Sequence, residues 1–327
     1  MVTPPKITLM EAKHKGWDAW RLQRGRLELV LVPQVGGRIM GMIWRGRNLS
    51  FTQPEREGQV EGVRAVKDVR ARKREMGFPL WGGDKTWLSP QTRWTDGVPF
   101  LELDSGPYEL SVIQSDRDAA IVRMTSKICR ETGLQITRTV TMSSQSQEWT
   151  VIHQLLNRSS LDVHWGVWDV TMVLKPGNVY LPRNPASGYP NGVKTFDEEG
   201  ESIQVRDKVV DDIGSLAVIA CMDTKAFKFG VDAQEGWMLG VLHVAGMGLV
   251  GYRKQVPTHA DKCYGHGCIA EVYNSDRYPY FEMEIHGPVV SLGPGASFEL
   301  EERQALFDVP RWPQSEDEVR QYMELRS

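Results

Sequence analysis

The chain has 327 residues, of which 41% are hydrophobic and 25% charged, with a net charge of −3. This balance predicts a globular protein and excludes nucleic acid and anionic membranes as partners, since both require a concentrated basic surface. Four cysteines in so long a chain do not form a disulfide framework, and no run approaches the ~20 apolar residues of a membrane span.

We expect one domain over residues 1–327, because no linker or internal repeat divides the chain. The first ten residues contain no continuous apolar stretch of the kind that forms a secretory signal, which favours the cytoplasm. The sequence leaves the oligomeric state open.

The first fifty residues predict β-hairpins. Strands over 17–22 and 27–32 flank a turn at Arg24-Gly25, and residues 39–44 resume extended structure after Gly36-Gly37.

Residues 54–76 differ, because they are dense in charges of both signs. This stretch is interpreted as a solvated helix or excursion, with a lid over an anionic substrate as the alternative.

From residue 98 onward the pattern is one of repeated strands. Residues 136–142 set Ile136, Val140 and Met142 on one face and three threonines on the other, which is typical of a half-buried sheet. Further strands are expected over 163–174, 216–222, 237–244, 280–286 and 298–306. Helix is predicted mainly over 315–326, where Ser315 precedes an acidic first turn.

So many strands with so few helices predict an all-β sandwich of two large antiparallel sheets, with under a fifth of the residues helical. No phosphate loop, dinucleotide fingerprint, zinc-protease motif or serine elbow occurs. No cofactor is therefore expected.

Three segments carry candidate chemistry. Trp81-Gly82-Gly83-Asp84-Lys85-Thr86-Trp87 lets the backbone approach a ligand between two tryptophans, although a structural turn with an ion pair is the alternative. His164 and Trp168 share one face of the strand over 163–174, where a histidine over a stacked sugar ring would suit a general acid. A hydrogen-bonded structural histidine is the alternative there.

The third segment is the strand over residues 280–286. Its polar face carries Tyr280, Glu282, Glu284 and His286, with the two carboxylates ~6.5–7 Å apart along the strand. Such a pair can raise the pKa of one carboxyl group and create a general base, whereas a solvated outer face is the alternative.

A local group of metal-capable side chains follows residue 258, namely His259, Cys263, His266 and Cys268. The spacing lacks the Cys-x2-Cys pair typical of structural zinc, so no metal is expected. Glu271 begins a new strand directly afterwards and is a candidate to reach a cleft.

Residues 31–39, LVPQVGGRI, resemble the opening of aldose 1-epimerase relatives, in which a strand, a proline and a glycine pair precede Arg-Ile. Gly82-Gly83, the turn at 157–160 before His164 and Trp168, and Glu284 followed by Gly-Pro-Gly at 293–295 occur in the same order. The resemblance to the galactose mutarotase-like superfamily spans residues 20–306. It implies a β-supersandwich that binds carbohydrate on a concave sheet.

In mutarotases a glutamate takes the proton of the anomeric hydroxyl and a histidine protonates the ring oxygen. By position Glu284 resembles the base, and His164 is the histidine nearest to the acid's motif, with Trp168 as the other occupant of that place. A second family histidine is missing near Gly82-Gly83, where Asp84 and Lys85 stand.

The resemblance therefore implies a protein that binds a small-molecule carbohydrate, with Glu284 as base and His164 as acid if it turns over an aldose or sugar derivative. The expected substrate-binding residues are Arg38, Trp81, Asp84, Lys85, Trp87, Trp168, Glu271 and Glu282. A non-catalytic sugar-binding module and a polysaccharide-processing enzyme are the alternatives. The sequence leaves turnover and the identity of the sugar open.

Overall fold

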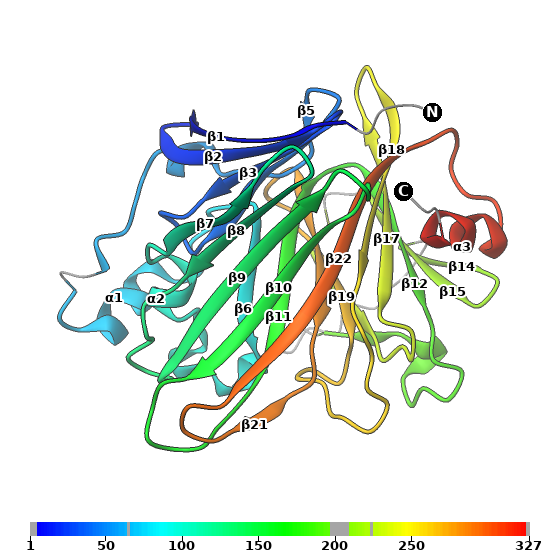
Figure 1. Ribbon diagram of the computed structural model, residues 1–327. Helices are drawn as coiled ribbons and strands as arrows, with labels where there is room; N and C mark the ends of the chain where they lie inside the picture. The colour runs from blue at the N-terminus through cyan, green and yellow to red at the C-terminus, as the bar shows by residue number, and fades with distance from the viewer. Residues whose placement is uncertain (1–4, 64–65, 197–208, 223–224, 325–327) are drawn as a thin grey trace.

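The computed structural model describes residues 5–63, 66–196, 209–222 and 225–324. Strands make up 51% and helices 11% of the structure, so the predicted all-β class and low helix content are confirmed. Figure 1 shows β9, β10 and β22 side by side, with α1 and α2 at one end of the molecule and α3 at the other. Among the residues described, no helix has the length and apolar character needed to span a bilayer.

In the described part of the chain, the first sheet has twelve antiparallel strands, and it carries the cleft described below. Its order is β1 (Ile7–His14), β2 (Trp17–Arg24), β3 (Leu27–Val32), β4 (Arg38–Trp44), β6 (Asp84–Ser89), β11 (Val163–Leu174), β20 (Tyr280–His286), β19 (Ala270–Asn274), β16 (Phe227–Val231) and β13 (Lys194–Thr195), with β5 (Arg47–Asn48) beside β4 and β21 (Val290–Leu292) beside β11.

The second sheet has ten antiparallel strands among the described residues. Its order is β14 (Val210–Ile213), β15 (Leu216–Cys221), β12 (Gly177–Pro182), β17 (Trp237–Val244), β18 (Gly248–Gln255), β22 (Ser297–Val309), β10 (Trp149–Asn157), β9 (Leu134–Ser143), β8 (Ala119–Thr125) and β7 (Glu109–Ser115).

The main core lies between the two sheets, because each sheet turns one alternating set of apolar side chains inward. Phe281, Met283 and Ile285 of β20 belong to this core, as do Ile136 and Val140 of β9. The threonines of β9 are only half buried, which confirms the predicted alternation on that strand.

Three α-helices lie among the described residues: α1 (Val69–Met76), α2 (Leu101–Asp104) and α3 (Glu316–Glu324). α3 lies within the segment 315–326 for which the sequence predicts a C-terminal helix; its Val319 is buried, and the amide N–H of Glu318 donates to the hydroxyl of Ser315 over 3.3 Å. The prediction extends to residue 326, but residues 325–327 lie outside the described part of the chain.

The charged stretch 54–76 contains a 3-10 turn (Pro54–Arg56) and α1, with residues 64–65 outside the described part. Lys73 of α1 is buried, and its Nζ lies 3.0 Å from a carboxylate oxygen of Glu131. A buried ion pair therefore anchors α1 to the body of the protein. The role of this stretch as a lid remains a prediction.

Candidate functional site

The candidate site lies on the face of the twelve-stranded sheet that points away from the ten-stranded sheet. Successive side chains of β20 alternate, so Glu282, Glu284 and His286 share this face while Met283 faces the core. Register brings β11 and β19 alongside, with Val170 and Glu271 both opposite Glu284. Every residue of β20 is buried, so its polar side is a covered site rather than a solvated outer face.

A cleft of about 790 Å³ opens over these strands, within the ~300–1,000 Å³ usual for a small-ligand site. We refer to it as the cleft. It is lined by Phe78, Pro79, Leu80, Lys85, Trp87, Gln91, Trp168, Met172, Lys228, Tyr273, Tyr280 and Glu282. Aromatic rings and two lysines thus surround one lining carboxylate, a mixture that suits a ligand with apolar C–H faces and hydroxyl groups.

Lys85 and Glu282 form the charged pair of the cleft lining. The Lys85 ammonium lies 3.4 Å from Oε1 of Glu282 and 4.1 Å from the centre of the Trp87 ring. Burial lowers the pKa of Lys85, although the neighbouring Glu282 carboxylate opposes that shift. The proton of Lys85 is therefore held less tightly than that of a free lysine.

Beneath the cleft, Lys228 joins two carboxylates on neighbouring strands. Its Nζ lies 2.8 Å from Glu271 and 2.8 Å from Glu284, and the indole N–H of Trp168 donates to Glu284 over 2.8 Å. Lys228 and Trp168 thus cover Glu284, which is fully buried and absent from the cleft lining.

The charges of this group follow from burial and proximity. Burial raises the pKa of Glu284 to about 8, against the opposing effect of Lys228. Burial alone would raise the pKa of Glu271 too, but Lys228, His286 and His266 outweigh it and hold that pKa well below its ordinary value. Burial also lowers the pKa of Lys228, yet the two carboxylates outweigh it and raise that pKa. At neutral pH the pair Lys228–Glu271 is charged and Glu284 is largely protonated.

Two histidines flank Glu271. The backbone N–H of Gln91 donates to Nε2 of His266 over 3.0 Å, so the neutral imidazole carries its proton on Nδ1 and donates it to Glu271 over 2.8 Å. Nε2 of His286 lies 3.2 Å from the same carboxylate, and burial lowers the pKa of His286 to about 4. His286 is thus neutral at physiological pH and stacks on Trp168, with ring centres 5.4 Å apart.

His266, Glu271 and His286 form a metal-capable group by proximity alone. A ring nitrogen that carries a proton has no lone pair for a metal, and the Nδ1 of His266 that faces Glu271 carries one. Lys228 adds a positive charge 2.8 Å from the same carboxylate. This arrangement therefore does not suit a cation. Of the cysteines near this loop, Cys263 is exposed and Cys268 is buried, and the absence of zinc remains a prediction.

The structure brings six of the predicted residues together. Lys85, Trp87, Trp168 and Glu282 line the cleft, and Glu271 and Glu284 lie directly beneath it.

The predicted acid lies apart from this group. His164 is exposed at the start of β11, four residues before Trp168, and its backbone carbonyl accepts from Arg93 over 2.6 Å. It is not among the residues that line the cleft.

Arg38 and Trp81 are buried behind the cleft rather than in it. The Arg38 guanidinium lies 2.6 Å from Oδ1 of Asp104, which also accepts from the indole N–H of Trp87 over 2.7 Å. Arg38 therefore contacts the cleft only indirectly, through the Asp104 carboxylate that accepts the hydrogen bond of Trp87. Trp81 packs in a small core outside the cleft and donates to Ser105 over 2.9 Å.

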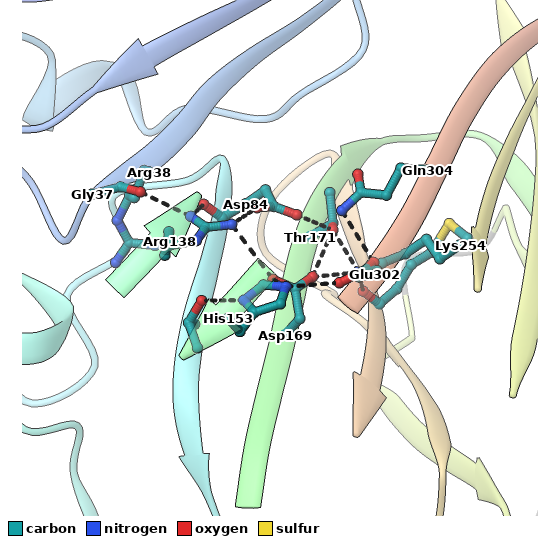
Figure 2. Close-up of polar contacts among 12 residues, drawn as sticks. Gly37, Arg38, Asp84, Arg138, His153, Asp169, Thr171, Lys254, Glu302 and Gln304 are labelled. Atoms are coloured by element: carbon teal, nitrogen blue, oxygen red, sulfur yellow. Dashed lines mark hydrogen bonds and ion pairs between the residues drawn. The ribbon is translucent and has the colours of Figure 1, made fainter. Parts of the chain in front are cut away.

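Asp84 faces the opposite side of the sheet, between the two sheets. Its carboxylate contacts Arg138 of β9 and accepts from Thr171 of β11 over 2.7 Å, as Figure 2 shows. Register explains this placement, because Asp84 and Lys85 are neighbours on β6 and must point to opposite faces. Asp84 therefore links the strands under the cleft and is not part of the cleft surface.

The same inter-sheet group extends from Asp84 to β18 and β22 (Figure 2). Lys254 lies 2.5 Å from Asp169 and 3.2 Å from Glu302, and His153 lies 3.2 Å from Glu302. His153, Asp169 and Glu302 are close enough to hold a metal, but Lys254 already supplies the positive charge there. We call this buried set of ionic residues the inter-sheet network.

The sequence interpretation missed Lys228, the cation that joins Glu271 to Glu284. Its one signal is a lysine between two phenylalanines in the short strand β16, a position where a solvated side chain is not expected. The pairing of β16 with β19, which brings it to the site, is a long-range feature that no local pattern contains.

No family model matches the chain, and no curated protein does. Among solved structures, the Slr1438 protein of Synechocystis sp. PCC 6803 superposes with a TM-score of 0.56 at 9% identity, covering 94% of this chain and 98% of that one. Galactose mutarotase-like proteins from Clostridium acetobutylicum (TM-score 0.52, 11% identity, 93% and 99% covered) and Lactobacillus casei ATCC 334 (0.54, 10%, 88% and 100%) are also similar. The chain has the galactose mutarotase-like fold, as the sequence resemblance predicted.

Proposed function

We propose that the protein binds a sugar in the cleft and interconverts its anomers by acid–base chemistry. The observation that carries the proposal is the pair Lys85–Glu282, a lysine and a carboxylate 3.4 Å apart in the lining of an aromatic cleft. The galactose mutarotase-like fold supports a sugar as the ligand only by analogy, since one fold hosts many activities.

In this mechanism Glu282 accepts the proton of the anomeric hydroxyl while Lys85 donates a proton to the ring oxygen. The bond between C1 and the ring oxygen breaks, which gives the open-chain aldehyde. Rotation about the C1–C2 bond and the reverse proton transfers close the other anomer and return both side chains to their starting states. The two groups can serve neighbouring oxygens of one carbon because they are adjacent to each other.

Glu284 and His164 were the base and acid expected from the sequence, and they remain the competing assignment. Glu282 is preferred here because it lines the cleft, whereas Glu284 is covered by Lys228 and Trp168. Lys85 is preferred over the exposed His164 for the same reason. Lys228 and Trp168 then form the cleft floor, and the carboxylates beneath hold Lys228 in place.

The test is the rate of anomer exchange, followed by polarimetry or NMR over a panel of aldoses. Glu282→Gln and Lys85→Met should each slow exchange by about 10²–10⁴-fold, the usual effect of losing one positioned acid or base, while sugar affinity stays within about tenfold. His164→Asn and the matched surface variant Glu299→Gln should exchange at the wild-type rate.

A larger loss in Glu284→Gln and His164→Asn than in Glu282→Gln and Lys85→Met would restore the assignment made from the sequence. A wild type that binds a sugar without accelerating exchange would leave a non-catalytic binding module. A wild type that binds none of the sugars would end the proposal.

A further inference from the structure

We infer that the substrate is a reducing disaccharide or longer saccharide, whose reducing ring lies in the cleft and whose second ring lies in an adjoining hollow. This inference rests on the proposed function and adds the size of the ligand to it. It is carried by a second cavity beside the cleft, by exposed aromatic rings along it, and by a buried amide oxygen that accepts no hydrogen bond from the described residues.

The adjoining hollow, which we call the side hollow, has a volume of about 740 Å³. It adjoins the cleft, because Phe78, Leu80, Tyr273 and Tyr280 line both. Tyr280 precedes Glu282 by two residues on β20, a step of ~7 Å along the strand. A ring bound over Glu282 would therefore have its linked neighbour over Tyr280 and beyond, in the side hollow.

Two aromatic side chains along this path are exposed although they are large and apolar. Phe78 is 53% exposed and Tyr278 is 39% exposed. Each ring packs against another aromatic ring: Phe78 lies edge-on to Trp87 with ring centres 6.2 Å apart, and the ring centres of Tyr278 and Phe51 are 6.0 Å apart. Rings that are fixed yet open to solvent offer flat faces on which the C–H face of a sugar can pack.

The backbone also fixes Tyr278. It lies in the turn between β19 and β20, where the amides of Arg277 and Tyr278 donate to the hydroxyl of Ser275 over 3.2 and 3.1 Å. Tyr278 therefore lines the side hollow from a hydrogen-bonded turn. Less backbone freedom is lost there on ligand binding than in an unsupported loop.

The polar lining of the side hollow suits hydroxyl groups without net charge. Glu55 and Asp276 are matched by Arg56 and Arg277, so neither sign dominates. Gln53 is 8% exposed, its amide N–H donates to Glu55 over 2.5 Å, and its Oε1 accepts no hydrogen bond from the described residues. A buried acceptor without a donor is costly, and a sugar hydroxyl can supply that donor.

The test compares aldoses with disaccharides that have the same reducing-end aldose, by calorimetry on the full chain. At least one disaccharide should bind about five- to tenfold more tightly than its reducing-end monosaccharide, which is the range of one aromatic contact. Tyr278→Ala, which changes a residue of the side hollow but not of the cleft, should remove that gain and leave monosaccharide affinity and anomer exchange unchanged. Leu161→Ala, another exposed apolar side chain, is the control and should alter neither.

Equal affinity for monosaccharides and disaccharides in the wild type would overturn the inference. So would a Tyr278→Ala variant that weakens both ligands alike. Either result leaves the proposed function standing if monosaccharides bind and exchange, whereas a protein that binds no sugar of any length ends both.

Discussion

The indole N–H of Trp168 donates a hydrogen bond to Oε2 of Glu284 over 2.8 Å, and both residues are buried. Trp168 lies opposite His286 in the register of β11 and β20, so its ring crosses to the carboxylate two residues earlier on β20. The tryptophan that lines the cleft is thereby tied to the carboxyl group of Glu284 beneath it. Changes in the charge of Glu284 must act on the cleft surface through this bond and through Lys228.

Trp168→Phe tests the strength of this tie. The variant keeps an aromatic ring but removes the N–H, and loss of a buried hydrogen bond to a carboxyl group should cost about 1–3 kcal/mol of unfolding free energy. The hydrogen bond is stronger when its acceptor is charged, so the cost should be larger at pH 9, where Glu284 is ionised, than at pH 6. The contribution of the cavity left by the indole is the same at both pH values. Urea denaturation at both pH values measures this, and equal losses would show that packing alone is involved.

The raised pKa of Glu284 makes a prediction about stability against pH. An acid whose pKa is raised to about 8 on folding keeps its proton where the unfolded chain has lost it, so its contribution to stability falls as pH rises from about 4.5 to 8. The lowered pKa of His286 acts in the opposite direction but only between about 4 and 6.5. Between pH 6.5 and 8, wild type should therefore lose up to about 1.4 kcal/mol per pH unit relative to Glu284→Gln.

The measurement is the difference in unfolding free energy between wild type and Glu284→Gln at four or five pH values in that window. A constant difference would show that Glu284 is ionised throughout. Glu299→Gln, an exposed carboxylate on β22, serves as control and should run parallel to wild type.

Lys228→Met removes the cation that Glu271 and Glu284 share. It leaves the Glu271 carboxylate buried without its ammonium partner, so we expect a loss of about 3–5 kcal/mol of unfolding free energy. The double variant Lys228→Met/Glu271→Gln should recover part of the loss, because the uncompensated charge is gone. Chemical denaturation of wild type, Lys228→Met, Glu271→Gln and the double variant checks this, and a double variant as unstable as the sum of its single changes would argue against charge as the cause.

The fold was predictable because its signal is local and repeated. Alternation over residues 280–286 and the threonines of β9 are visible in the sequence, and both hold in the structure. The side of the sheet on which a polar residue lies was less predictable. Asp84 and Lys85 are adjacent next to a glycine pair, yet the register of β6 sends Asp84 into the core and Lys85 into the cleft.

Polar residues inside the core were missed for a related physical reason. Arg138 lies between Ile136 and Val140 on the buried face of β9. The apolar pattern of that face gives no reason to expect that the arginine side chain is buried with it. Its partner Asp84 lies 54 residues earlier in the chain on the other sheet. A long-range ion pair of this kind becomes visible only when both sheets are assembled.

Arg138 provides the last prediction, which concerns the inter-sheet network. Its guanidinium is fully buried, donates to the carbonyls of Gly37 and Asp84 over 2.9 Å each, and contacts the Asp84 carboxylate (Figure 2). Arg138→Met would leave the carboxylate without its cation and both carbonyls without this donor, so we expect a loss of about 3–5 kcal/mol of unfolding free energy. Arg138→Lys keeps the charge but not the planar fork, and its loss should be intermediate.

Arg123→Met, at an exposed position of the neighbouring strand β8, is the control and should stay within about 0.5 kcal/mol of wild type. Urea denaturation ranks the three variants, and an Arg138→Met protein as stable as Arg123→Met would mean that the network contributes nothing to holding β6 and β9 together.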